Sequence, residues 1–103
     1  MTNQVFIARI EDQNVGYIWV GQVRRVFTGE MQAHILNLFV TNEFRGQGVG
    51  ARLLKRAEAW AREHHLTRIG LSVAAHNSIA IGLYEKLGYE IETQRMIKIL
   101  GDA

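Results

Sequence analysis

The sequence predicts an α/β (α+β) fold with a mixed, mostly antiparallel central sheet and elements in the order β-β-β-α-β-α-β-β. Short apolar runs separated by polar turns fill the first forty residues, as is typical of strands. Apolar residues then recur every three or four positions, which indicates a helix. Neither a repeat nor a linker interrupts the 103 residues, so we expect a single domain over residues 1–103.

The composition excludes several classes of protein. Without Cys there is no disulfide framework, thiolate metal site or cysteine nucleophile, and the four His lack metal-site spacing, so we expect no metal. Twelve basic against ten acidic residues give a net charge of only +2, which does not indicate a nucleic-acid binder with its Lys and Arg clustered on one face, so we expect no nucleic-acid partner. The apolar runs are strand-sized and the first residues do not form a signal peptide, so we expect no membrane partner and a cytoplasmic location.

The first half of the chain predicts three strands and a helix. Residues 5–10 and 15–23 are apolar runs around a polar turn and predict an antiparallel hairpin. Residues 33–40 are apolar on both faces, as expected for a central strand. Helical spacing of apolar residues over 48–64 then predicts an amphipathic helix.

The second half predicts one strand, one helix and two closing strands. Residues 67–74 are expected to form a buried strand. Asn77 or Ser78 caps the second helix, and Gly88 ends it. The closing strands are expected at 89–93 and 95–100, paired antiparallel around Gln94.

The connection between the third strand and the first helix reads Arg45-Gly46-Gln47-Gly48-Val49-Gly50. Its three glycines allow left-handed backbone conformations and remove side chains that would shield the amides. The start of a helix adds a positive potential at the same place. The loop therefore predicts a site for a phosphate or pyrophosphate.

Two common phosphate-binding motifs fit this loop poorly. A P-loop needs Lys and then Ser or Thr after its last glycine, but Ala51 and Arg52 follow Gly50. The dinucleotide fingerprint G-x-G-x-x-A is matched by Gly46, Gly48 and Ala51, but the strand that follows carries no acidic residue for a ribose. A dinucleotide-binding domain remains the less favoured alternative.

Two segments resemble the GNAT (GCN5-related) N-acetyltransferase superfamily. Residues 40–50 have the form V-x-x-x-x-R-x-x-G-x-G, which is the acyl-CoA signature of these enzymes. Residues 77–89 resemble a second family motif, N-x-x-A-x-x-L-Y-E-K-L-G-[FY]. The resemblance covers roughly residues 15–100 and implies the acyl-CoA N-acyltransferase fold. The usual N-terminal strand and two helices are missing, so we expect a truncated form or a minimal member that borrows a wall from a partner.

The resemblance implies roles for individual residues. The main chain of Leu38, Phe39 and Val40 would pair with the pantetheine arm of acetyl-CoA, once the third and fourth strands splay after Val40. The loop amides would hold the pyrophosphate, which makes cofactor-binding residues of Arg45, Gly46, Gln47, Gly48, Val49 and Gly50. Asn77 would contact the pantetheine arm, and Tyr84 would protonate the departing thiolate as general acid.

The general base is the least certain role that the resemblance implies. One family position for a base is filled by Ser72, which cannot serve. Another family position, on the third strand, is His34. Strand alternation places His34 on the same face as Leu36, Leu38 and Val40. Because His titrates near neutrality, His34 is the candidate base, acting directly or through a water.

The resulting prediction is an acyltransferase that moves an acetyl group from acetyl-CoA to a primary amine by direct attack in a ternary complex. The amine is a small molecule, a peptide N-terminus or a lysine. The competing prediction is a non-catalytic acyl-CoA-binding or regulatory module. Because an exposed sheet edge favours association, we also expect a homodimer.

Overall fold

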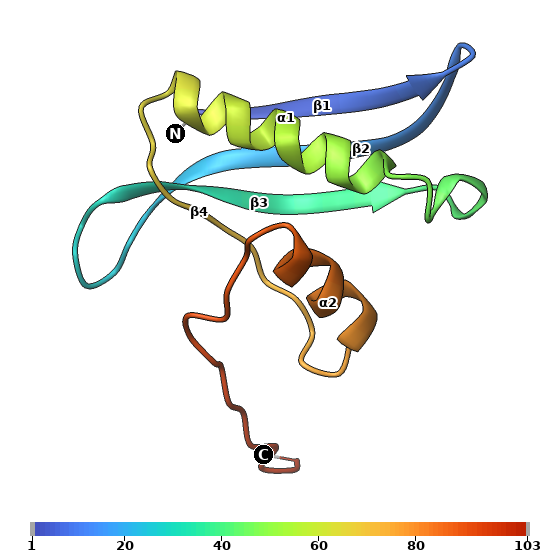
Figure 1. Cartoon of the computed structure of the whole chain (residues 1–103). Helices are drawn as coiled ribbons and strands as arrows, with labels where there is room; N and C mark the ends of the chain where they lie inside the picture. Colours follow the sequence, from blue (N-terminus) through green and yellow to red (C-terminus); the bar gives the residue numbers. More distant parts are fainter. Residues whose placement is uncertain (1, 103) are drawn as a thin grey trace. The chain divides into compact units, whose positions relative to one another are not determined.

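The computed structural model describes residues 2–102, which fall into two compact units. The first unit ends at Ser72 and contains the sheet and one long helix, and the second begins at Val73 and contains one short helix. Figure 1 traces both units along the chain.

The sheet has four strands in the order β1-β2-β3-β4. Strand β1 (Asn3–Ile10) pairs antiparallel with β2 (Gln13–Arg24), and β2 pairs antiparallel with β3 (Met31–Val40). The parallel partner of β3 is β4, which is only two residues long (Ile69–Gly70). The mixed, mostly antiparallel sheet confirms the predicted fold class. The predicted strand at 67–74 is reduced to its two residues that pair with β3.

Helix α1 (Val49–Glu63) lies against one face of the sheet and contacts β1, β2 and β3 (Figure 1). The core between them is built from buried apolar side chains: Val15, Ile18, Val20, Ala33, Ile35, Val49, Leu53, Leu54, Ala57, Trp60 and Ala61. Gly16 lets β2 lie close to β3, because a Cβ there would lie 2.6 Å from the Phe39 carbonyl oxygen. Along the part of the chain that the structure describes, neither helix is long and apolar enough to cross a membrane.

A β-bulge in β3 overturns the predicted side-chain alternation. Trp19 of β2 pairs with Asn37, but the next residue of β2 pairs with Ile35, so Leu36 is the extra residue. His34 therefore lies opposite Gly21, whereas Leu38 lies opposite Ile18 on the face covered by α1. The expectation that His34 shares a face with Leu38 and Val40 is wrong, because the bulge shifts the alternation by one residue. Of the three residues predicted to share a face with His34, Leu36 is the one that does so.

In the second unit, helix α2 (Ser78–Lys86) begins after Asn77, which is one of the two predicted caps. Gly88 has a φ of 96° just past its end and provides the left-handed residue that stops it. The closing strands predicted at 89–93 and 95–100 do not form, since no strand is assigned between Tyr89 and Asp102. A strand needs a neighbouring ladder as well as an alternating sequence, and residues 89–102 have no such ladder among the described residues.

Candidate functional site

The end of β3 and the start of α1 are joined by a short 3₁₀ helix, Asn42–Phe44, and a glycine-rich turn. The amide of Thr41 donates to the Val15 carbonyl (2.8 Å), and this bond ties the connection to β2. Gly46 and Gly48 have φ angles of 78° and 82°, in the left-handed region where a side chain is strained. The two glycines of Gly-x-Gly therefore allow the backbone turn that leads from the 3₁₀ helix into α1.

Space beside the turn is open. A Cβ built on Gly46 or Gly48 would meet no atom within 4 Å. At Gly50, which lies in the first turn of α1, a Cβ would only touch Cγ2 of Val40 at 3.9 Å. Packing within the protein therefore does not explain the glycine at position 50.

The backbone amides of residues 46–51 have no hydrogen-bond acceptor among the described residues. Gly48 is the N-cap of α1 and has no side chain to cap the helix, and the first turn contains no acidic residue. The partial positive charge of the helix start is therefore not neutralised by the cap or by the first turn of α1. Such an arrangement favours an anion with several oxygen atoms, such as a pyrophosphate.

The neighbouring edge of β3 is unpaired in the first unit. Pairing with β4 ends at His34 and Gly70, six residues before β3 itself ends at Val40. The sequence placed the splay after Val40, so the separation begins earlier than predicted. Among the described residues, the main chain of residues 35–40 has no strand partner on that side, which leaves it able to pair with an extended ligand.

Arg45 stabilises the end of β3. Its Nε donates to the Val40 carbonyl oxygen at 3.0 Å, and its guanidinium carbon lies 6.0 Å from the centre of the Phe39 ring. The sequence could not reveal this contact, because a bond between side chain and main chain leaves no pattern. Arg45 therefore links the two candidate binding segments, 38–40 and 45–50.

His34 is half-buried on the sheet face opposite α1. A Cβ built on Gly70 would lie 3.6 Å from its Nδ1, so the imidazole lies beside the short strand β4. Its ring nitrogens have no hydrogen-bond partner among the described residues.

The second unit holds Asn77 and Tyr84. Oδ1 of Asn77 accepts from the amide of Ala80 at 3.1 Å, which makes Asn77 the cap of α2. The ring of Tyr84 meets that of Tyr89 edge to face, with centroids 5.9 Å apart. Burial raises the pKa of the Tyr84 phenol above its ordinary value of 10.0, so the hydroxyl stays protonated at neutral pH.

In the first unit the structure thus brings residues 38–40 and 45–50 together. It places His34 on the sheet face opposite α1. Asn77 and Tyr84 share the helix of the second unit.

The sequence model of the acetyltransferase (GNAT) family matches residues 2–89, so the chain belongs to this family. This agrees with the four-stranded mixed sheet and with the glycine-rich entry into α1.

A curated relative in Bacillus subtilis is the uncharacterized N-acetyltransferase YdgE, 31% identical over 94 residues. The aligned region is 91% of this chain and 59% of YdgE. The chain therefore spans less than two thirds of the length of this relative.

Two solved structures resemble the fold. A putative acetyl transferase from Pyrococcus furiosus has a TM-score of 0.90 at 30% identity, covering 96% of this chain and 66% of that one. The aminoglycoside N-acetyltransferase AAC(6′)-Iy, solved with CoA, has a TM-score of 0.81 at 22% identity, covering 96% of this chain and 75% of that one. This likeness identifies the acyl-CoA N-acyltransferase fold.

Proposed function

We propose that the chain transfers an acetyl group from acetyl-CoA to a primary amine by direct attack in a ternary complex. One observation supports the proposal most directly. The stretch of β3 that has no strand partner on one side is followed in the chain by residues 46–51, whose amides have no hydrogen-bond acceptor among the described residues. The amides suit the pyrophosphate, and the strand edge suits the amide groups of the pantetheine arm. CoA combines these two chemical groups in one molecule.

In the proposed reaction the amine nitrogen attacks the thioester carbonyl carbon and forms the new C–N bond. His34 takes the proton that the amine loses, directly or through a water. The C–S bond then breaks, and Tyr84 donates its phenolic proton to the thiolate. The Tyr84 phenol is protonated at neutral pH, so its proton is available for transfer to the thiolate.

Asn77 is proposed to contact the pantetheine arm. Arg45 is proposed to hold the end of β3 in place. The cap that Asn77 forms uses its Oδ1, so its Nδ2 remains available to donate to a ligand carbonyl.

The acceptor amine can be identified by screening a panel of candidate amines. AAC(6′)-Iy is named for aminoglycosides, so aminoglycosides belong in the panel with peptide N-termini, lysine and polyamines. The test is release of free CoA thiol from acetyl-CoA in the presence of each amine. Amine-dependent release supports an acetyltransferase. CoA binding without release for any amine favours the alternative of a non-catalytic acyl-CoA-binding module, and NAD(H) binding without CoA binding favours a dinucleotide-binding domain.

The active form is proposed to be a homodimer. Large apolar side chains are exposed on the face of the sheet opposite α1, which a second copy would cover: Val5, Ile7, Trp19, Leu36 and Phe39.

A further inference from the structure

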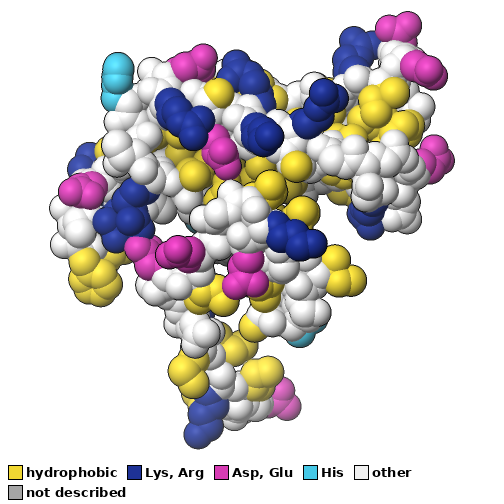
Figure 2. Space-filling view, in the orientation of Figure 1, with side chains coloured by type: hydrophobic (Ala, Val, Ile, Leu, Met, Phe, Trp, Pro, Cys, Tyr) yellow, Lys and Arg dark blue, Asp and Glu magenta, His cyan; other side chains and the backbone are white. Residues whose placement is uncertain are grey.

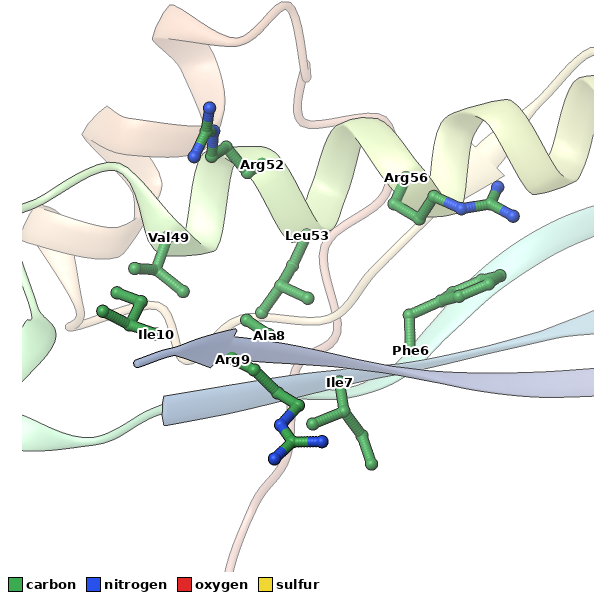
Figure 3. A pocket seen from close by; sticks show the side chains of 9 residues that line it. All are labelled: Phe6, Ile7, Ala8, Arg9, Ile10, Val49, Arg52, Leu53 and Arg56. Atoms are coloured by element: carbon green, nitrogen blue, oxygen red, sulfur yellow. The ribbon is translucent and has the colours of Figure 1, made fainter. Parts of the chain in front are cut away.

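Helix α1 is positively charged on the side that points away from the sheet. Arg52, Lys55 and Arg62 are exposed there, and at about 100° per residue they lie within a sector of about 80° opposite the buried side chains of the helix. Figure 3 shows Arg52 pointing away from β1, whereas Leu53 points towards it. Figure 2 shows basic side chains gathered over α1 on the face in view. These three cations, together with Ala59 between them, form the outer face of α1.

The charge of the outer face is not neutralised within the described chain. None of its three cations has a hydrogen-bond or ion-pair partner among the residues that the structure describes. Of the two acidic residues of α1, Glu63 lies 3.7 Å from Arg56, and Glu58 is half-buried outside the sector. Three unpaired positive charges thus extend over about 15 Å of helix, from Arg52 to Arg62.

The stability of the helix does not explain this distribution of charge. Arg52 is the fourth residue of α1, near the positive end of the helix, where a cation is unfavourable. It lies three residues before Lys55 and four before Arg56, and like charges at these spacings destabilise a helix. A glutamate in place of Ala59 would pair with both Lys55 and Arg62, but the chain has alanine there. A ligand therefore explains the positive face better than the fold does.

We propose that the outer face of α1 binds an acidic helix of a partner protein. Carboxylates at every third or fourth position of that helix follow the spacing of the cations. The small side chain of Ala59 lets the axes of the two helices approach to about 8–10 Å. A nucleic acid is a poorer occupant, because the whole chain has a net charge of only +2. The proposal does not depend on acetyl transfer.

The test uses an end-capped, fluorescently labelled helical peptide of Ala and Glu, with Glu at every third and fourth position. The matched peptide has Gln in place of each Glu, which removes the charge and keeps a similar helix propensity. Fluorescence anisotropy is expected to show the Glu peptide binding at least about tenfold tighter than the Gln peptide. This difference is expected to shrink as the salt concentration rises. Equal affinity of the two peptides would overturn the proposal.

Ala59→Glu locates the site without weakening the fold. The new carboxylate lies beside Lys55 and Arg62, so the free energy of unfolding is expected to stay nearly unchanged. Binding of the Glu peptide is expected to weaken about tenfold, because the centre of the face becomes negative. The matched control is Gln94→Glu, which adds the same charge at an exposed residue of the second unit and leaves binding nearly unchanged. Equal loss in both variants, or no loss in Ala59→Glu, would place the peptide on another surface and contradict the proposal.

A competing explanation is that the cations serve the proposed phosphate-binding loop, because Arg52 follows that loop directly in the chain. A mixture of CoA and peptide separates the two explanations. If the outer face binds a partner helix, the Glu peptide is expected to bind CoA-saturated protein about as tightly as free protein. If saturating CoA displaces the peptide, the cations belong to the phosphate site and the proposal fails.

Discussion

Three glycines in the loop before α1 are present for two different physical reasons. Gly46 and Gly48 have positive φ angles, so any side chain there strains the turn itself. Gly50 is helical with a negative φ, and the fold leaves room for a methyl group beside Val40. A requirement for glycine at position 50 is therefore a requirement of the ligand, which makes this position the sharper test of the proposed pyrophosphate site.

Gly50→Ala is expected to leave the free energy of unfolding equal or slightly higher, because Ala favours the helix. CoA affinity is expected to fall at least about tenfold, since the methyl group would stand among the amides that hold the pyrophosphate. Calorimetry measures the affinity and urea unfolding the stability. Gly82→Ala is the matched control: it is also a helical glycine with open space, and it lies about 140° around α2 from Asn77. Unchanged CoA affinity in Gly50→Ala would remove the loop from the site.

Tyr84→Phe retains the ring that packs on Tyr89 but removes the proton donor. Turnover is expected to fall by roughly 10²–10⁴-fold while CoA affinity persists. The raised pKa gives a second readout. Above about pH 10 the unfolded chain loses the phenolic proton before the folded protein does, so the free energy of unfolding falls as pH rises. Urea unfolding on either side of that pH should show a smaller fall in Tyr84→Phe. Full activity in the variant would mean that water protonates the thiolate.

His34→Gln separates a catalytic from a structural histidine. A base must be unprotonated, so the wild-type rate is expected to rise with pH through one step, and the variant is expected to lack that step. The pH dependence of kcat/KM measures it. If the step survives in His34→Gln, it belongs to the substrate amine, and His34 is a residue of the sheet surface.

At the scale of elements, the sequence predicted the antiparallel hairpin, the third strand and both helices, because each has a local pattern. It missed the bulge at Leu36 because residues 33–40 are mostly apolar on both faces, so a one-residue shift changes no visible alternation. The closing strands fail for another reason. Residues 89–100 have apolar residues suited to a strand, but pairing depends on distant residues that no local pattern contains.

For the candidate site, the motif predicted which residues belong to the loop, whereas the cap of α2 was left open between Asn77 and Ser78 and is Asn77. The phosphate-binding role of the loop stays a prediction, and the contact of Arg45 with the Val40 carbonyl was not predictable. The sequence also did not predict that β3 separates from β4 after Gly70, because the residues after Gly70 are as apolar as those before it.

Asn77 offers a test that separates capping from ligand contact. Asn77→Ala loses the bond to the Ala80 amide and is expected to destabilise α2 by about 1 kcal/mol. Asn77→Ser keeps a capping oxygen but loses the side-chain NH₂ group. If Asn77 contacts pantetheine, Asn77→Ser retains the helix content measured by circular dichroism but binds CoA more weakly. Equal CoA affinity in Asn77→Ser and the wild type would leave Asn77 as a cap alone.

At the scale of the whole molecule, α1 covers only one face of the sheet in the first unit. On the other face, cross-strand pairing aligns Val5 with Trp19 and Ile7 with Tyr17, and the Tyr17 and Phe39 rings lie 6.0 Å apart. Aromatic side chains of this kind are enriched in protein interfaces. This face is therefore the surface on which the proposed homodimer is best tested.

Trp19→Lys is expected to weaken self-association by at least about tenfold, because it places a charge in the centre of the apolar face and removes a large buried contact. Trp19 is 40% exposed, so the fold can accept lysine with its charge in water. The control is Val26→Lys, which adds the same charge at a side chain that is 90% exposed in the connection between β2 and β3. Sedimentation over a range of protein concentrations measures the monomer–dimer equilibrium. A monomeric wild type at the highest concentration, or equal dissociation by both variants, would show that this face does not form a homodimer interface.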